Sequence, residues 1–234
     1  MIRTIFGIDQ RRFAHVAFLF SGASSLVFQT VWTRMLHHVF GAKSAAIGAV
    51  FVAFMVGLGF GAWISGRMAD RIKHPIFAYA LIEIAIAAWG LLIPFLVDSE
   101  GFLATVNAFL RQELSAESGT FMSARFLCVV PILLVPTTLM GMSLPLLAQH
   151  VAREERGKGP NLVGVYVGAL YAIHIFGAAC EPILPPFILM RTAGLAITNV
   201  IASSLCLTLA ALIFAFRKPL IGKRIGSGEK ILIR

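Results

Sequence analysis

The sequence predicts an all-α integral membrane protein, built as a bundle of six transmembrane helices. Apolar residues make up 58% of the 234 residues and charged residues only 13%, whereas a soluble domain is roughly a quarter charged. Six apolar runs are each long enough to cross the ~30 Å hydrocarbon core of a bilayer, and most basic residues lie between or beyond them. Because a soluble protein this apolar would expose large patches and aggregate, the composition requires a bilayer as solvent.

Six predicted spans account for most of the chain, at about 13–36, 44–66, 76–97, 124–148, 162–189 and 193–216. Together they form one predicted membrane domain over residues 1–216, followed by a basic tail over 217–234. The first span follows Arg11 and Arg12 and is too long for a cleaved signal peptide. We therefore expect it to remain in the membrane as an anchor.

The connections between the spans are short except for 98–123. That connection contains an amphipathic piece around Phe109, Leu110 and Arg111. Amphipathic helices of this kind lie in the plane of the membrane interface, and we expect that position here.

The distribution of Lys and Arg predicts the orientation of the bundle. Fifteen of these 20 residues lie in the N-terminal segment, in the connections after the second and fourth spans, and in the tail. Only five fall on the other side: Arg34, Lys43, Arg111, Arg125 and Arg191. Because cytoplasmic segments carry the excess of basic residues, both termini are predicted to be cytoplasmic. The net charge of +9 follows from this topology, and no basic patch with interleaved aromatic residues indicates nucleic-acid binding.

Small residues recur at four-residue spacing in two spans, which lets a neighbouring helix approach closely. The second span carries Ala45, Ala49, Ala53, Gly57, Gly61 and Ser65, and the fifth carries Gly164, Gly168 and Ala172. We expect these stripes to serve mainly packing within the chain. The expected partners are the lipid bilayer and, as alternatives, a second copy of the chain or other membrane-protein subunits.

The motifs of enzyme catalysis and cofactor binding are not found in this sequence. It has no Ser-His-Asp pattern, H-E-x-x-H, C-x-x-C or phosphate loop. Cys128, Cys180 and Cys206 are far apart inside apolar runs and are predicted to be buried small side chains. His37 and His38 are predicted to lie at the interface. We therefore expect no metal, no cofactor and no catalytic residue.

Ionisable residues inside membrane spans are costly and mark candidate functional sites. Glu83 in the third span and His174 in the fifth are both predicted near the middle of the bilayer. Their depths differ by about 7 Å at 1.5 Å per residue, so a Glu83–His174 pair is one hypothesis. Local bonding of each side chain to backbone or hydroxyl groups is the alternative.

Glu181 is a third candidate, seven residues after His174 and directly before Pro182. Prolines interrupt the helix here and free backbone carbonyls, a combination that transporters use to build ion sites. Gln29 and Arg125 are the predicted neighbours of this carboxylate. The alternative is an interfacial carboxylate at the end of the helix.

Several motifs along the chain resemble one family. Ser21, Gly22, Leu26, Gln29, Trp32 and Arg34 follow the first-span pattern S-G-x-x-x-L-x-Y-Q-x-x-W-x-R, with Phe28 in place of Tyr. Later matches are 51–58, 66–71, Tyr79 to Glu83 (Y-A-L-x-E), Pro136 to Leu147 (P-T-x-L-M-G-x-x-L-P-L-L) and Leu170 to Ala178. Together they resemble the membrane domain of bacterial spermidine-synthase-like proteins, the fused major-facilitator/spermidine synthases. This resemblance implies a multi-pass protein of the bacterial inner membrane.

The chain departs from that family in three places. His174 stands where Asn is usual, and Glu181 and Pro186 stand where small residues are usual. Fused relatives also carry a cytoplasmic aminopropyltransferase domain after the bundle. The 18 residues over 217–234 cannot form that domain, so no synthase activity is expected.

The connection formed by Gly66, Arg67, Asp70 and Arg71 also resembles the G-x-x-x-D-R motif of major-facilitator transporters, and six spans would equal half of such a transporter. In those transporters the motif's charges hold helix ends together. The alternative is a set of basic membrane anchors with one compensating acid.

Two functions follow as hypotheses. The first is a transporter-like protein that handles a small amine or a proton. The second is a non-catalytic membrane subunit or anchor of a larger complex, or of a separately encoded synthase.

Overall fold

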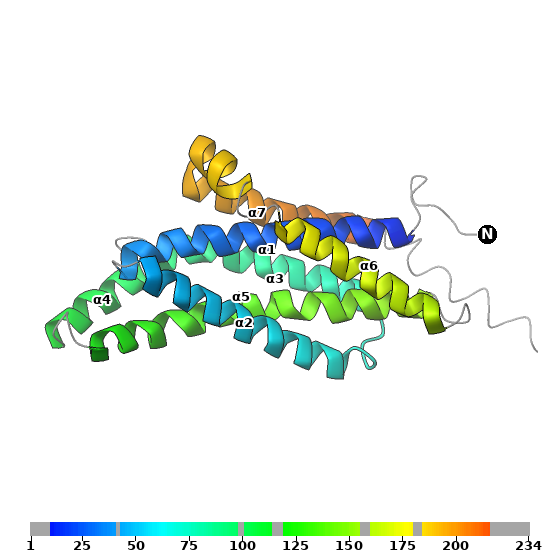
Figure 1. Ribbon diagram of the computed structural model, residues 1–234, viewed down its shortest axis with the longest axis horizontal. Coiled ribbons are helices and arrows are strands. Elements are labelled where there is room, and N and C mark those ends of the chain that lie inside the picture. The colour runs from blue at the N-terminus through cyan, green and yellow to red at the C-terminus, as the bar shows by residue number, and fades with distance from the viewer. Residues whose placement is uncertain are drawn as a thin grey trace, which may run out of the picture.

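The computed structural model describes residues 10–40, 43–97, 101–113, 119–154, 160–179 and 184–215. Every regular element in this part of the chain is a helix (Figure 1). The elements are α1 (Gln10–Phe40), α2 (Lys43–Met68), α3 (Pro75–Val97), α4 (Phe102–Glu113), α5 (Gly119–Glu154), α6 (Pro160–Ala179), the π-helix η1 (Leu184–Leu189) and α7 (Met190–Ala215). The all-α prediction is confirmed.

Among the described residues, five helical stretches are long and apolar enough to cross a membrane, judged by length and composition. They are His15–His37, Ser44–Met68, Pro75–Glu113, Gly119–Arg153 and Pro186–Ala215. They overlap five of the six predicted spans, all except 162–189. The chain therefore has the helices of a multi-pass membrane protein.

The predicted span 162–189 is described in two parts, because residues 180–183 lie outside the described structure. Helix α6 ends at Ala179, and η1 begins at Leu184. Its described apolar part, Gly164–Phe176, is shorter than the other five stretches.

The last helix contains a bend of its own. Gly194 in α7 has φ of 79° and ψ of 174°, outside the helical region. Residues other than glycine rarely adopt this backbone conformation. In Figure 1, η1 and the beginning of α7 are turned away from the axis of the rest of α7.

Helix α4 occupies the amphipathic part of the long connection. Its Leu103 is buried, whereas Phe102, Phe109 and Arg111 are exposed. It packs on α3 and α5 near one end of the bundle (Figure 1). The amphipathic helix predicted around Phe109 is therefore present.

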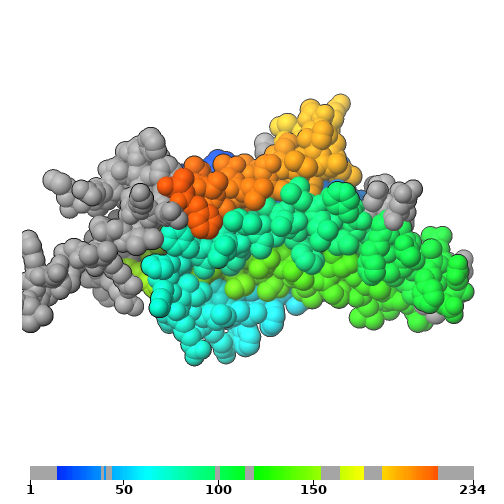
Figure 2. Space-filling model, turned by 180° about the vertical axis from the view of Figure 1, so that it is seen from behind, coloured from blue at the N-terminus to red at the C-terminus, as the bar shows by residue number. Residues whose placement is uncertain are grey.

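Helix α1 is the centre of the bundle. It contacts every other described helix, whereas α2 contacts only α1 and α5. Seen from behind in Figure 2, α7 lies along α3, with α5 on the opposite side of α3. The largest side chains in the buried core include Trp32, Phe28 and Tyr79. Large apolar side chains such as Phe95, Leu127 and Phe176 instead point outward, as a lipid-facing surface requires.

The small-residue stripe of α2 faces α5. A Cβ atom added to Gly61 would overlap the backbone carbonyl of Thr138, and one added to Gly57 would overlap the side chain of Thr137. The Thr137 hydroxyl also donates to the carbonyl of Ala53, 3.0 Å away. Close approach of the α2 and α5 backbones therefore depends on these small residues.

The stripe of α6 has the opposite environment. Gly164 and Gly168 are exposed, and no atom of another described helix lies within 4 Å of a Cβ built on either. The expectation that both stripes pack within the chain is thus correct for α2. For the described part of α6 it is wrong, because this face of α6 points away from α1 and α5.

Candidate intramembrane polar site

Glu83 lies at the centre of the bundle, where α3 faces α1. Its side chain is fully buried. The hydroxyl of Ser21 donates to Glu83 Oε1 over 2.5 Å, and Glu83 Oε2 has no hydrogen-bond partner. A buried polar atom without a hydrogen-bond partner lowers the stability of the fold by roughly 1–3 kcal/mol. The unpaired Oε2 atom is therefore unfavourable for folding and marks Glu83 as a candidate functional residue.

Hydroxyl and thiol groups from three helices surround this carboxyl group. The Tyr79 hydroxyl, one turn earlier on α3, donates to the carbonyl of Ala17 over 3.4 Å. Ser24 on α1 donates to the carbonyl of Ser21 and lies 3.3 Å from Cys206 Sγ on α7. No Lys, Arg or His of the described chain forms an ion pair with Glu83. Since a buried carboxylate is costly unless it is paired, the group needs either a proton or a cation.

A second polar layer joins the same three helices further along the bundle. The indole of Trp32 donates to Asn199 Oδ1 over 3.2 Å. Asn199 Nδ2 in turn donates to the carbonyl of Gly90 over 2.7 Å, and Ser203 donates to the Asn199 carbonyl. This layer is satisfied internally and holds α1, α3 and α7 together. The Glu83 layer differs from this second layer because it contains a buried oxygen, Glu83 Oε2, without a hydrogen-bond partner.

His174 does not pair with Glu83, and the hypothesis of a Glu83–His174 pair is wrong. The imidazole stacks on Phe18 of α1 with ring centroids 4.8 Å apart, and its Nδ1 has no hydrogen-bond partner. A Cβ added to Gly22 would lie 2.5 Å from that nitrogen. The physical reason is topological: α3 and α6 do not contact one another in the described structure, and both pack on α1.

The remaining intramembrane candidates do not form a common site with Glu83. Glu181 lies outside the described residues. Gln29 is half-buried on α1. Arg125 is buried at the start of α5, where it binds Asn107 and the carbonyl of Phe40. Phe40 is eleven residues beyond Gln29 on the same helix, or about 16 Å, so Gln29 and Arg125 belong to different levels of the bundle.

The G-x-x-x-D-R connection between α2 and α3 is bound by the end of α5. Asp70 Oδ1 accepts a hydrogen bond from Gln149 Nε2 over 2.7 Å. Arg67 lies over the ring of Trp63, 4.2 Å from its centroid, while Gly66 and Arg71 are exposed. Among the charged residues of the motif, the acid is therefore the one that contacts another helix.

Arg153 makes the most extensive contact with this connection, and sequence reasoning did not single it out. Its guanidinium donates to four backbone carbonyls, those of Ile72, Lys73, Ala69 and Asp70. These carbonyls lie at and beyond the end of α2, where helical partners are missing. A basic residue in the last turn of a long helix was the available signal, but the sequence does not show which carbonyls it reaches.

The described part of the chain holds no group of three or more His, Cys, Asp and Glu residues suited to a metal ion. Comparisons with protein-family models, with curated proteins and with solved structures each returned no match.

Proposed function

We propose that this chain is a transporter-like membrane protein in which Glu83 binds a proton during movement of a small amine. The observation that carries the proposal is the Glu83 carboxyl group, fully buried and with one oxygen unpaired. Ionisable side chains inside a membrane bundle are rare, and in pumps and transporters carboxyl groups of this kind relay protons.

The surroundings of Glu83 favour a proton over a larger cation in this conformation. Oε2 is inaccessible, and its neighbours Tyr79, Ser24 and Cys206 are themselves buried. An amine could reach the carboxyl group only if α1, α3 and α7 moved apart. Loss of the proton would leave an unpaired buried charge, so deprotonation would favour that opening.

The six-span topology, the orientation and the family are parts of the same proposal. Helix α6 has 20 residues, about 30 Å at 1.5 Å per residue, which is the thickness of the hydrocarbon core. Counting it as the sixth crossing puts both termini on the cytoplasmic side of an inner membrane. The bundle would then be one half of a major-facilitator-like transporter, similar to the membrane domain of spermidine-synthase-like proteins.

Uptake by proteoliposomes tests this function. With the outside acidic relative to the inside, vesicles containing the protein should exchange protons and take up or release spermidine, and Glu83→Gln should abolish both. Glu113→Gln is the matched control, because Glu113 is an exposed carboxylate at the end of α4. Equal fluxes in the wild type and in Glu83→Gln would remove Glu83 from the mechanism.

A non-catalytic subunit of a membrane complex is the second candidate. The specific observation in its favour is the open face of α6, where no other described helix lies within 4 Å of a Cβ built on Gly164 or Gly168. Exposed glycines are typical of surfaces on which another transmembrane helix packs. Purification in a mild detergent distinguishes the two: a co-purifying chain that is lost in Gly168→Leu supports the subunit, and a lone chain argues against it.

A further inference from the structure

We propose that the groove between α4 and α5 binds the phosphate of an anionic phospholipid through Arg125 and Arg111. This site is independent of Glu83 and of the proposed transport function. Three observations support this site: the environment of Arg125, the apolar pocket beside Arg125, and the position of Arg125 near the end of the bundle.

Arg125 is a buried cation whose described neighbours include no anion. The side chain is only 5% exposed. Nε and Nη2 both donate to the amide oxygen of Asn107, and Nη1 donates to the carbonyl of Phe40 over 3.1 Å. The guanidinium also lies over the ring of Phe121, 4.1 Å from its centroid. All these partners are formally neutral, and a guanidinium has five N–H donors, so donor capacity remains.

Arg111 is a second cation in this region, and it adds to the positive charge that a bound anion would neutralise. Arg111, exposed near the end of α4, lies one helical turn after Asn107, the residue that binds Arg125. The described acid nearest to it in sequence, Glu113, forms no ion pair with Arg125. Two like charges that share a site are unfavourable unless an anion compensates them. Arginine is the side chain best suited to a phosphate, because its planar fork can donate two parallel hydrogen bonds.

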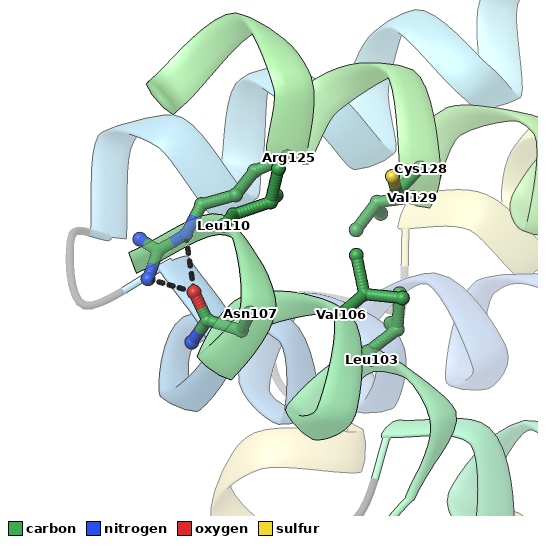
Figure 3. A pocket seen from close by; sticks show the side chains of 7 residues that line it. All are labelled: Leu103, Val106, Asn107, Leu110, Arg125, Cys128 and Val129. Carbon is green, nitrogen blue, oxygen red and sulfur yellow. Dashed lines mark hydrogen bonds between the residues drawn. The ribbon is translucent and has the colours of Figure 1, made fainter. Parts of the chain in front are cut away.

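An apolar pocket adjoins Arg125 (Figure 3). Leu103, Val106 and Leu110 of α4 line one side, and Cys128 and Val129 of α5 line the other. In Figure 3 the guanidinium of Arg125 points toward Asn107 and away from Cys128 and Val129, while Val106 and Val129 face one another. A cationic end beside an apolar surface matches an amphiphile with its headgroup at Arg125 and its acyl chain along the apolar side chains of α4 and α5.

The place of Arg125 along α5 fits a lipid headgroup rather than the bilayer centre. It lies six residues after Gly119, the first residue of α5, or about 9 Å along the helix. The sequence predicts that the hydrocarbon-spanning segment begins at residue 124. The guanidinium is therefore expected at the depth of the phosphates, where basic side chains recognise anionic lipids.

Lipid binding measured by native mass spectrometry tests the site in the full chain. Delipidated protein in detergent is titrated with phosphatidylglycerol, with phosphatidylcholine and, separately, with inorganic phosphate. Phosphatidylglycerol should bind tightest, and Arg125→Gln should weaken it about tenfold, since a hydrogen bond to a charged group contributes about 1.5–3 kcal/mol. Arg111→Gln should weaken it less, and Arg191→Gln, an exposed arginine on α7, should not change it.

Two readouts keep the test decisive if Arg125→Gln folds poorly. Arg111 is exposed, so Arg111→Gln is expected to fold and still to bind less phosphatidylglycerol. Cys128 lines the pocket, so phosphatidylglycerol should slow its reaction with a maleimide in the wild type, measured on the Cys128 peptide. Equal binding of both lipids, an equal effect of inorganic phosphate alone, or unprotected Cys128 would each overturn the proposal.

Discussion

The two glycine-containing stripes of α2 and α6 share a spacing and differ in what they contact. Gly57 and Gly61 of α2 lie against Thr137 and Thr138 of α5, with no space for a Cβ atom. The stripe of α6 faces open space, and α6 instead packs on α1 through the ring of His174. Four-residue spacing therefore predicts a smooth helix face, but it does not predict which helix, if any, covers that face.

The largest effect that separates the two stripes is expected from Gly61→Ala. The new Cβ would overlap the Thr138 carbonyl and lie 3.0 Å from the Cα of Gly141. Both are backbone atoms, so the helices must separate, and we expect a loss of about 3 kcal/mol of unfolding free energy. Unfolding of the purified protein by SDS, followed by tryptophan fluorescence, measures it. A change below about 0.5 kcal/mol, the range of ordinary surface substitutions, would contradict the tight α2–α5 contact.

Gly57→Ala should lower the free energy of unfolding by less than Gly61→Ala does, by about 2 kcal/mol. The atom that the new Cβ meets first is the Thr137 hydroxyl, which belongs to a side chain and can turn. The Thr137 Cβ would still lie only 2.6 Å from the new Cβ, so rotation of the hydroxyl removes only part of the steric overlap. The same titration applies, and Gly59→Ala is the matched control because a Cβ there meets nothing within 4 Å. A larger loss in Gly59→Ala than in Gly57→Ala would reverse this interpretation.

Gly22→Ala tests the contact that α6 does make. Its Cβ would meet the His174 ring, which can swing away from α1 at a cost of about 1 kcal/mol. Replacing the ring as well, in Gly22→Ala with His174→Ala, should make the effect of the first substitution smaller than it is alone. Additive effects in this double-mutant cycle would show that Gly22 and His174 are not coupled.

Gly168→Ala should have the smallest effect, within about 0.5 kcal/mol of the wild type. The position is exposed and open, and alanine favours the helix over glycine. Unfolding in detergent and the mass of the purified complex check this together. A clear loss of stability or a change in mass would mean that another helix covers this face of α6.

The lipid-facing helices could be predicted from sequence, and the details of the polar site could not. Long apolar runs such as those of α2 and α3 are sufficient evidence, because their length alone matches the bilayer. Glu83 was also identifiable, since a carboxyl group inside an apolar run is costly anywhere in the fold. Its donor, Ser21, lies 62 residues away in sequence, and Asn199 and Arg153 find their partners only when distant helices come together.

The sequence by itself therefore determined the class of protein, the approximate positions of its apolar helices and the rare polar residues within them. These follow from composition and from the length of apolar runs, which depend on no particular neighbour. Only the tertiary structure decided that α1 separates Glu83 from His174, that α5 covers the glycines of α2, and that α6 leaves its own uncovered. The physical reason is that helices in lipid associate through shape and hydrogen bonds, and both depend on which faces meet.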